Sequence, residues 1–276
     1  MSLKDILKEK LSEPELRILR RSFEIIGDIA IIEIPEELLS KKNLIVEAIL
    51  SKHRHIKTVL RKSGQVDGVY RVAGYEVIYG KETETIAKEY GCRFLVDPTK
   101  VYYSSKLSTE RERVAKLVKN GERVLVMFAG VGPFAILIAK LSKANEVIGV
   151  ELNKFAVEYF RRNVRLNKVE NIIVLEGDVA EIVPKLEGRF DRVLMPAPYS
   201  AESFVYLLKG KVKKGGFVHY YTFESENFEK ELPKKVEEIF LKNGIAAKVV
   251  FMRRCGNFAP YVNRYVLDLQ YLGEVN

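Results

Sequence analysis

The sequence is poor in cysteine and histidine and lacks long apolar runs. Cys92 and Cys255 are far apart and form no CxxC pair, which argues against a disulfide framework or a zinc site. The three histidines, His53, His55 and His219, are too scattered to suggest a metal site. We therefore expect a fold that is held together by its core, without metals or cross-links.

No apolar stretch approaches the ~20 residues that a membrane-spanning helix needs. The first residues, MSLKDILKEKLSEPELR, carry charges throughout, unlike a signal peptide. The composition, 47% hydrophobic and 30% charged over 276 residues, allows a sizeable core in a soluble protein. These features predict a cytoplasmic protein.

Positive charge is in excess. The chain has 46 lysines and arginines against 37 aspartates and glutamates, a net charge of +9 at pH 7. Such an excess attracts polyanions such as RNA, because phosphate contacts release condensed counterions. Many lysine- and glutamate-rich proteins are merely well solvated, so charge alone does not decide for nucleic-acid binding.

Residues 1–98 are predicted to form a small α+β domain. The apolar run Asp28–Ile34 is typical of a strand, and residues 35–53 have helical spacing. The pair Asp97-Pro98 marks the border with the next domain. Three more strands are predicted at residues 57–62, 70–80 and 93–97.

Residues 99–276 are predicted to form a doubly wound α/β domain. In STERERVAKLVKNG, Thr109 and Glu112 fit a helical capping box, and Gly121 follows the helix end. Strands and helices then alternate, which predicts a mostly parallel sheet covered on both faces. The predicted strands are 123–129, 146–152, 171–178, 189–198, 215–223, 246–255 and 263–272, and the further helices are 132–143, 154–168, 179–186, 201–212 and 229–244.

The segment VLVMFAGVGPF joins a strand, a tight turn and a helix start. Gly130 and Gly132 allow a sharp turn and the close approach of a ligand. Glu151 ends the next strand 21 residues after Gly130, close to the spacing of a carboxylate that binds ribose hydroxyls. Asp178 ends the third strand, where a carboxylate can meet an adenine amino group. All lie at carboxyl ends of neighbouring strands, where open α/β sheets bind ligands.

S-adenosylmethionine fits this turn better than a dinucleotide. The turn reads GVGPF instead of GxGxxG, and Pro133 removes one amide donor from the helix start. The expected ligand is therefore an adenosine with a charged amino-acid tail and no phosphate. Without a ligand, the same residues would be an ordinary turn and two solvated strand ends.

Several motifs resemble one family, in that family's order. MFAGVGPF, GVELN, NVRLNKVENI, GDV, VHYYTF and APYVNRYVLDL resemble the archaeal and eukaryotic tRNA guanine-37 N1-methyltransferases, from about Ile26 to the C-terminus. The resemblance implies a class I, Rossmann-like S-adenosylmethionine-dependent methyltransferase domain at residues 99–276. It also implies that residues 1–98 position tRNA, with base 37 beside the anticodon as the target. We expect the protein to act as a monomer.

The resemblance also implies site residues. VYYSSKLSTERERV is similar to the segment in which a Tyr and a Glu-Arg pair border the methyl donor and the target base, here Tyr102, Glu110 and Arg111. GVYRVAGYEVIYG resembles the small-domain segment whose arginine reaches the active site, here Arg71. The expected S-adenosylmethionine-binding residues are Tyr102, Phe128, Gly130, Gly132, Glu151 and Asp178.

The chain also departs from the family. The family usually begins with a further domain that grips the tRNA elbow, for which there is little room here. Guanine-specific members carry Asn-Leu-Pro where this chain has Pro196-Ala197-Pro198, and Pro-x-Pro resembles the archaeal branch tied to wyosine biosynthesis. Those enzymes methylate guanosine 37, C7 of 4-demethylwyosine (giving isowyosine), or both. Val126 replaces the family's Asp, and Ser105-Lys106 its Pro-Arg, which implies altered cofactor and phosphate contacts.

The chemistry needs a base and a cation. N1 of guanine carries a proton, so a carboxylate within hydrogen-bond reach acts as general base, worth roughly 10²–10⁴ in rate. Glu110 is the candidate for this base. Alternatively, Glu110 only stabilises the start of its helix through its interaction with the helix dipole. Negative charge then grows on O6, where the guanidinium of Arg71 would stabilise it. As an alternative, Arg71 is a surface arginine on a strand.

Other residues are expected to contact the substrate. Arg111 lies about 100° around the helix from Glu110 and would hold a phosphate or orient Glu110. Tyr102 would stack on a base or line the methionine pocket, unless it is a core tyrosine. Pro196 offers no hydrogen-bond donor to the base and leaves space for the third ring of 4-demethylwyosine. Alternatively, Pro196 only shapes a loop. The expected phosphate-binding patch comprises Lys57, Arg61, Lys62, Arg253 and Arg254.

Two rival functions remain open at this point. One is the related wyosine-pathway enzyme that transfers the aminocarboxypropyl group of the same cofactor, which product mass would distinguish. The other is a non-catalytic RNA-binding protein, which calorimetry with S-adenosylmethionine would distinguish. A small-molecule methyltransferase agrees less well with the positive charge and the small leading domain.

Overall fold

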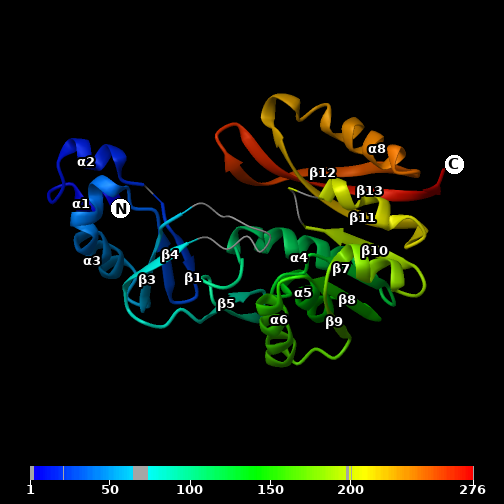
Figure 1. Ribbon diagram of the computed structural model, residues 1–276, viewed down its shortest axis with the longest axis horizontal. Helices are drawn as coiled ribbons and strands as arrows, with labels where there is room; N and C mark the ends of the chain where they lie inside the picture. Colours follow the sequence, from blue (N-terminus) through cyan, green and yellow to red (C-terminus); the bar gives the residue numbers. More distant parts are fainter. Residues whose placement is uncertain (1–2, 21, 65–73, 197–198, 200, 276) are drawn as a thin grey trace. The chain divides into compact units, whose positions relative to one another are not determined.

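The computed structural model describes residues 3–20, 22–64, 74–196, 199 and 201–275. The chain divides into two compact units, one of Met1–Glu89 with Arg93–Ser105 and one of Tyr90–Cys92 with Lys106–Asn276 (Figure 1). Within the described residues, no helix is long and apolar enough to cross a membrane.

The first unit is an α+β domain built on a four-stranded sheet of order β1-β2-β3-β4. β2 and β3 are parallel, and the two outer pairs are antiparallel. α1 and α3 pack on this sheet through fully buried Leu7, Ile45 and Ile49. The elements are α1 Leu3–Leu7, α2 Glu13–Ile18, β1 Glu24–Ile26, β2 Ile29–Ile32, η1 Glu36–Lys41, α3 Lys42–Lys52, β3 Thr58–Lys62, β4 Tyr75–Tyr79, β5 Thr85–Glu89 and β6 Cys92–Val96. Here and below, η marks a 3₁₀ helix.

The second unit contains a seven-stranded sheet of order β12-β13-β11-β10-β7-β8-β9. β11, β10, β7, β8 and β9 are parallel, and the two C-terminal strands extend the sheet antiparallel. The elements are η2 Ser105–Leu107, α4 Ser108–Leu117, β7 Arg123–Met127, α5 Pro133–Leu141, β8 Glu146–Glu151, α6 Lys154–Asn167, β9 Ile172–Glu176, α7 Val179–Ile182, η3 Val183–Lys185, β10 Phe190–Met195, η4 Ala201–Leu208, β11 Val212–Ser225, η5 Glu226–Phe228, α8 Leu232–Lys242, β12 Ile245–Ala259 and β13 Val262–Glu274.

Helices cover this sheet as a doubly wound fold requires. α5 and α6 lie beside β8 and β9, and α8 lies along β12 (Figure 1). α7, η4 and α8 share one continuous apolar core with the strands. The central strands are buried on both faces, which explains the nearly unbroken apolar run of β7, Arg123–Met127. The predicted doubly wound α/β fold is therefore confirmed.

Three local predictions were incomplete or wrong. The N-cap of α4 is Leu107, without a side-chain cap, so Thr109 and Glu112 form no capping box. The segment predicted as a helix over 201–212 is the 3₁₀ helix Ala201–Leu208. α1, α2, β1 and β5 were not predicted, because each is only three to six residues long and shows no clear periodicity.

The order of the strands defines where a ligand binds. β7 lies between β10 and β8, so the chain runs outward from β7 to β8 and β9 and then crosses to β10 on the other side. Ligands of open α/β sheets bind at such a switch point, beyond the carboxyl ends of the strands. The turn after β7 and Pro196 after β10 both lie there.

Candidate active site

The turn after β7 has a left-handed backbone conformation and is hydrogen-bonded to the last residue of β8. Phe128, Gly130 and Gly132 all have positive φ angles, of 53°, 57° and 86°. The amide of Gly130 donates to Oε2 of Glu151 at 2.7 Å, and Oε1 of Glu151 accepts from the amide of Asn153 at 2.8 Å. Glu151 therefore fixes the turn and the start of α6 at the carboxyl edge of the sheet.

Glycine is needed at positions 130 and 132 of the turn for different structural reasons. A Cβ on Gly132 would lie 2.0 Å from Cδ2 of Phe160, and a Cβ on Gly149 would lie 2.4 Å from Cε1 of the same ring. A Cβ on Gly130 would meet nothing within 4 Å. Gly132 is thus required by the packing of α6 against the sheet, and its contact with a ligand stays a prediction. Gly130 alone leaves open space over the turn.

The remaining predicted cofactor residues in this unit lie at the same edge. Asp178 follows β9 and caps α7, where Oδ1 accepts from the amide of Ala180 at 2.8 Å. The half-buried ring of Phe128 packs edge-to-face on Phe204, with centroids 5.1 Å apart. An open turn, a carboxylate at the last residue of β8 and a carboxylate after β9 together fit an adenosine-containing cofactor with a charged tail.

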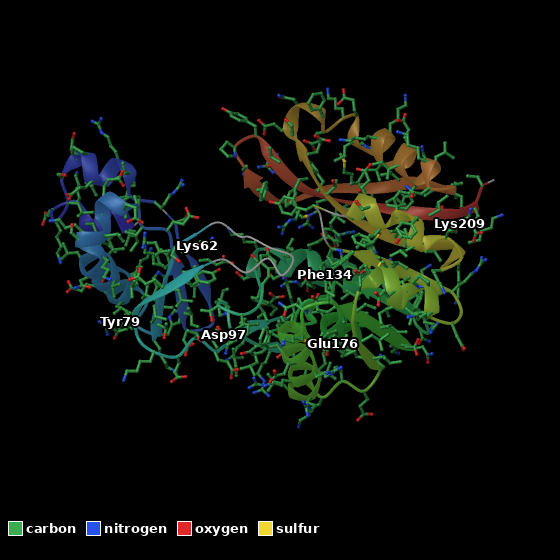
Figure 2. The ribbon with its side chains drawn as sticks, viewed as in Figure 1. Lys62, Tyr79, Asp97, Phe134, Glu176 and Lys209 are labelled. Atoms are coloured by element: carbon green, nitrogen blue, oxygen red, sulfur yellow. The ribbon has the colours of Figure 1, made fainter. Side chains whose placement is uncertain are left out.

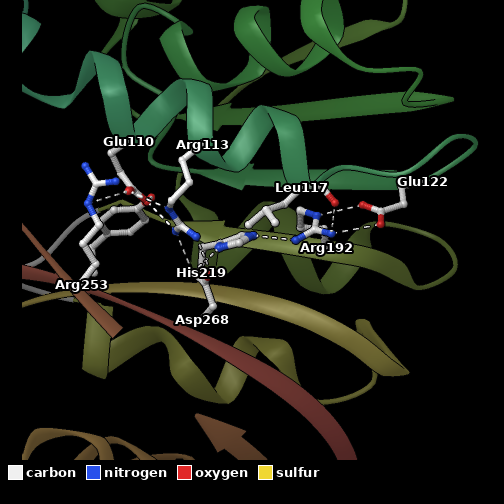
Figure 3. Close-up of polar contacts among 9 residues, drawn as sticks. Glu110, Arg113, Leu117, Glu122, Arg192, His219, Arg253 and Asp268 are labelled. Carbon is white, nitrogen blue, oxygen red and sulfur yellow. Dashed lines mark hydrogen bonds and ion pairs between the residues drawn. The ribbon is translucent and has the colours of Figure 1, made fainter. Parts of the chain in front are cut away.

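Glu110 is buried, accepts hydrogen bonds from two side chains and lies near the guanidinium of a third (Figure 3). Arg113 donates to both of its carboxylate oxygens, from Nε at 2.9 Å and from Nη2 at 2.7 Å. The hydroxyl of Tyr221 donates to Oε1 at 3.1 Å, and Nε of Arg253 lies 4.0 Å from Oε2. Only 1% of Glu110 is exposed, so its position is set by these partners and not by solvent.

The same arginine begins a buried polar chain that follows α4 (Figure 3). Arg113 donates to Asp268 at 2.6 and 3.0 Å, and Oδ1 of Asp268 lies 2.6 Å from Nδ1 of His219. Nε2 of His219 lies 2.8 Å from Nη1 of Arg192, which also holds Glu122 with two hydrogen bonds of 2.8 and 3.0 Å. Acidic and basic groups therefore alternate along this chain around one central imidazole.

The protonation states of this polar chain follow from its geometry. A guanidinium only donates, so Nε2 of His219 accepts from Arg192 and Nδ1 carries the proton that Asp268 accepts. The imidazole is therefore neutral, in agreement with the burial that lowers the pKa of His219. Burial alone would raise the pKa of Asp268, but hydrogen bonds from His219 and Arg113 hold it well below its usual range. Burial, with the nearby carboxylate of Glu110, raises the pKa of Tyr221 well above its ordinary value, so its hydroxyl remains a donor.

Aromatic contacts connect Glu110 with the glycine turn. Phe134, in the first turn of α5 (labelled in Figure 2), lies 5.7 Å from the ring of Tyr221. The guanidinium of Arg111 lies 5.9 Å from the centroid of Phe134, and Arg111 is 97% buried by the same packing. Glu110 and Arg111 thus face the helix that begins at the turn.

Other predicted residues lie elsewhere or serve other contacts. Pro196 is half-buried directly after β10, whereas Tyr102 is 46% exposed in the first unit. Arg71 lies outside the described residues. Arg61, predicted to contact phosphate, is buried and paired with Glu36 and Glu76, so it stabilises the first unit instead.

Sequence reasoning missed four members of the site: Arg113, His219, Tyr221 and Asp268. Arg113 follows Glu110 by three residues, the spacing of neighbours on one helix face, and this signal was available. His219 and Tyr221 lie in VHYYTF and Asp268 in VLDL, but no local pattern shows that these segments converge on Glu110.

The fold and this edge define an α/β enzyme that binds a nucleoside-containing cofactor beyond the carboxyl ends of its parallel strands. The family model described as TRM5/TYW2 methyltransferase domain matches residues 85–249, and the one described as TYW2 N-terminal domain matches residues 3–83. The chain belongs to the TRM5/TYW2 methyltransferase family.

Three curated relatives carry different activities in their names. The tRNA (guanine(37)-N(1))-methyltransferase Trm5b of Pyrococcus abyssi is 40% identical over 257 residues, 92% of this chain and 76% of that protein. The tRNA 4-demethylwyosine(37)-methyltransferase Taw21 of Saccharolobus solfataricus is 38% identical over 222 residues, 78% of this chain and 82% of that protein. The tRNA(Phe) (4-demethylwyosine(37)-C(7)) aminocarboxypropyltransferase of Methanocaldococcus jannaschii is 32% identical over 252 residues, 90% and 97% of the two chains.

Solved structures of relatives agree with the fold. The crystal structure of Trm5b from Pyrococcus abyssi superposes with a TM-score of 0.84 over 95% of this chain and 78% of that one, at 39% identity. TYW2 of Pyrococcus horikoshii in complex with MeSAdo superposes with a TM-score of 0.80 over 98% of both chains, at 28% identity.

Proposed function

We propose that this protein transfers the methyl group of S-adenosylmethionine to position 37 of tRNA. The main target is N1 of guanosine 37, and C7 of 4-demethylwyosine at the same position in tRNA-Phe is the second. The relatives named as tRNA methyltransferases support the substrate class, and the +9 charge agrees with a polyanionic substrate.

The buried carboxylate of Glu110 carries this proposal. A general base must lie in a defined orientation within reach of the proton that it removes. Glu110 is oriented by the two-pronged ion pair with Arg113 and by the hydroxyl of Tyr221. A glutamate that only interacts with the helix dipole needs neither burial nor fixed hydrogen-bond donors, whereas Glu110 is 99% buried and has both donors.

The cofactor supplies an electrophilic methyl group on a sulfonium. Glu151 and Asp178 would bind the ribose hydroxyls and the adenine amino group, and Gly130 leaves room for the adenosine. Gly132 acts indirectly, because it lets Phe160 pack beneath the turn. Phe128 would line the adenosine site, and Tyr102 the methionine pocket.

Other residues act on the target base. Glu110 accepts the N1 proton as the new bond forms, and Arg71 stabilises the charge that develops on O6. Arg111 lies against Phe134 at the start of α5 and orients this helix beside Glu110. Pro196 follows the strand at the switch point and offers no donor, which leaves space for the third ring of 4-demethylwyosine.

Aminocarboxypropyl transfer is the second candidate function. Both the match of residues 3–83 to the TYW2 N-terminal domain and the relative from Methanocaldococcus jannaschii favour it. The two reactions leave products of different mass on the same nucleoside, so mass spectrometry of digested tRNA distinguishes them.

Methylation of G37 transcripts by a Glu110→Gln variant tests the proposal. We expect single-turnover methylation to fall roughly 10²–10⁴-fold, because an amide cannot accept the proton. S-adenosylmethionine affinity, measured by calorimetry, should change little. Thermal unfolding confirms that the variant is folded at the assay temperature.

Glu112→Gln is the matched control, since Glu112 is on the same helix and pairs only with Lys116 among the described residues, at 2.7 Å. It should keep wild-type turnover. Turnover of Glu110→Gln equal to this control would remove Glu110 as the base. A wild-type protein that modifies neither G37 nor 4-demethylwyosine tRNA would overturn the proposed function.

A further inference from the structure

Three aromatic rings form a surface cluster: Tyr199 follows β10, Phe223 lies near the end of β11, and Phe258 lies near the end of β12. The centroids of Phe223 and Phe258 are 4.3 Å apart, and Tyr199 packs edge-on against both, at 4.7 and 5.2 Å. Tyr199 is 60% exposed and Phe258 is 49% exposed. We call Tyr199, Phe223 and Phe258 the aromatic platform. With Glu202, Lys235 and apolar residues of α8, they line a cavity of about 310 Å³.

Two arginines without acidic partners among the described residues belong to this region: Arg264 lies over Phe223, and Arg254 binds Asn257, the residue before Phe258. The guanidinium of Arg264 lies 5.3 Å from the centroid of Phe223, and Arg254 is exposed and donates to Asn257 at 2.8 Å. Neither has a carboxylate partner among the residues that the structure describes, whereas Arg123 and Arg192 each have one. Exposed rings beside uncompensated cations suit an aromatic anion better than an apolar protein surface.

The aromatic platform is close to the proposed base. Tyr221 and Phe223 are two residues apart on β11, about 7 Å along the strand. Tyr221 donates to Glu110. A nucleotide stacked on the platform would therefore adjoin a base that contacts Glu110.

We infer that the aromatic platform stacks an unpaired nucleotide of the tRNA anticodon loop, next to the nucleotide that is methylated. This inference rests on the proposed function for the identity of the RNA. Bases of single-stranded RNA are commonly bound by stacking on aromatic rings, while arginines contact the phosphates. Holding the neighbouring nucleotide keeps base 37 out of its own stack, which the reaction requires.

Fluorescence of 2-aminopurine in tRNA-Phe transcripts tests the platform. The probe replaces the base at position 36 in one transcript and at position 38 in another. We expect the wild-type protein to quench one of the two probes, and Tyr199→Leu and Phe258→Leu to lose that quenching. The KM for tRNA should rise about tenfold in both variants, at unchanged S-adenosylmethionine affinity, and Tyr199→Phe should restore it.

Tyr206→Leu and Phe228→Leu are the matched controls, because these rings are 50% and 59% exposed and lie outside the platform. Absence of quenching by the wild-type protein, or equal KM values in platform and control variants, would overturn the inference. Failure of the proposed function looks different, since the wild-type protein would then modify no tRNA while the quenching still reports stacking.

Discussion

Replacing Asp268 by Asn perturbs the centre of the buried polar chain. Its carboxylate is 6% exposed and accepts from Arg113 twice and from His219 once. An amide at this place turns one acceptor into a donor that faces another donor, and it removes the negative charge between two positive arginines. Breaking a buried ion pair in this way typically costs about 3–5 kcal/mol.

For a unit of this size, each kcal/mol lowers the Tm by about 2–4 °C, so a loss of about 3 kcal/mol corresponds to roughly 6–12 °C. Differential scanning calorimetry of the full chain at pH 7 measures the transition of the second unit. The pKa of Asp268 is held well below its usual range, so its contribution is complete above about pH 4 and is lost only as the pH falls further. The difference between wild type and variant should therefore be constant from pH 5 to 8.

Asp191→Asn is the matched control, because the Asp191 carboxylate is 26% exposed and its ion-pair partner Lys213 is 50% exposed. Its other oxygen accepts from the amide of Arg123 at 2.8 Å, and an asparagine oxygen can still accept this bond. Such a partly exposed pair is worth at most about 1 kcal/mol. If Asp268→Asn lost no more stability than Asp191→Asn, the polar chain would not stabilise the second unit. The reasoning about its alternating charges would then be refuted.

Two further predictions concern the turn and the imidazole. Gly132→Ala should lower the free energy of unfolding of the second unit by about 2–4 kcal/mol, because the new Cβ would clash with Phe160. Gly130→Ala should lower it by about 1 kcal/mol. Equal losses for the two variants in denaturant unfolding would contradict this difference. Burial lowers the pKa of His219 in the folded protein, so below about pH 6.5 the unfolded chain binds this proton before the folded protein does. The free energy of unfolding should therefore fall by up to ~1.4 kcal/mol for each pH unit below this value. His219→Gln should lose this slope and His55→Gln should keep it, as measured by unfolding at pH 5 to 8.

The sequence alone was enough for the fold class and for the neighbourhood of Gly130 and Glu151. Alternation of apolar strands and amphipathic helices predicts a doubly wound sheet, because local periodicity reports which face of an element is buried. The turn with Gly130 and the later Glu151 lie in neighbouring βα units, so their spacing is a local signal.

The contacts of Glu110 were decided only by the tertiary structure. Asp268 is 155 residues from Arg113, and His219 is 49 residues from Asp268, so their convergence depends on which strands become neighbours. No composition or spacing encodes the insertion of β13 between β11 and β12. The same is true of Phe160 beneath Gly132 and of the aromatic platform, because side chains that pack across different elements leave no periodic trace in the chain.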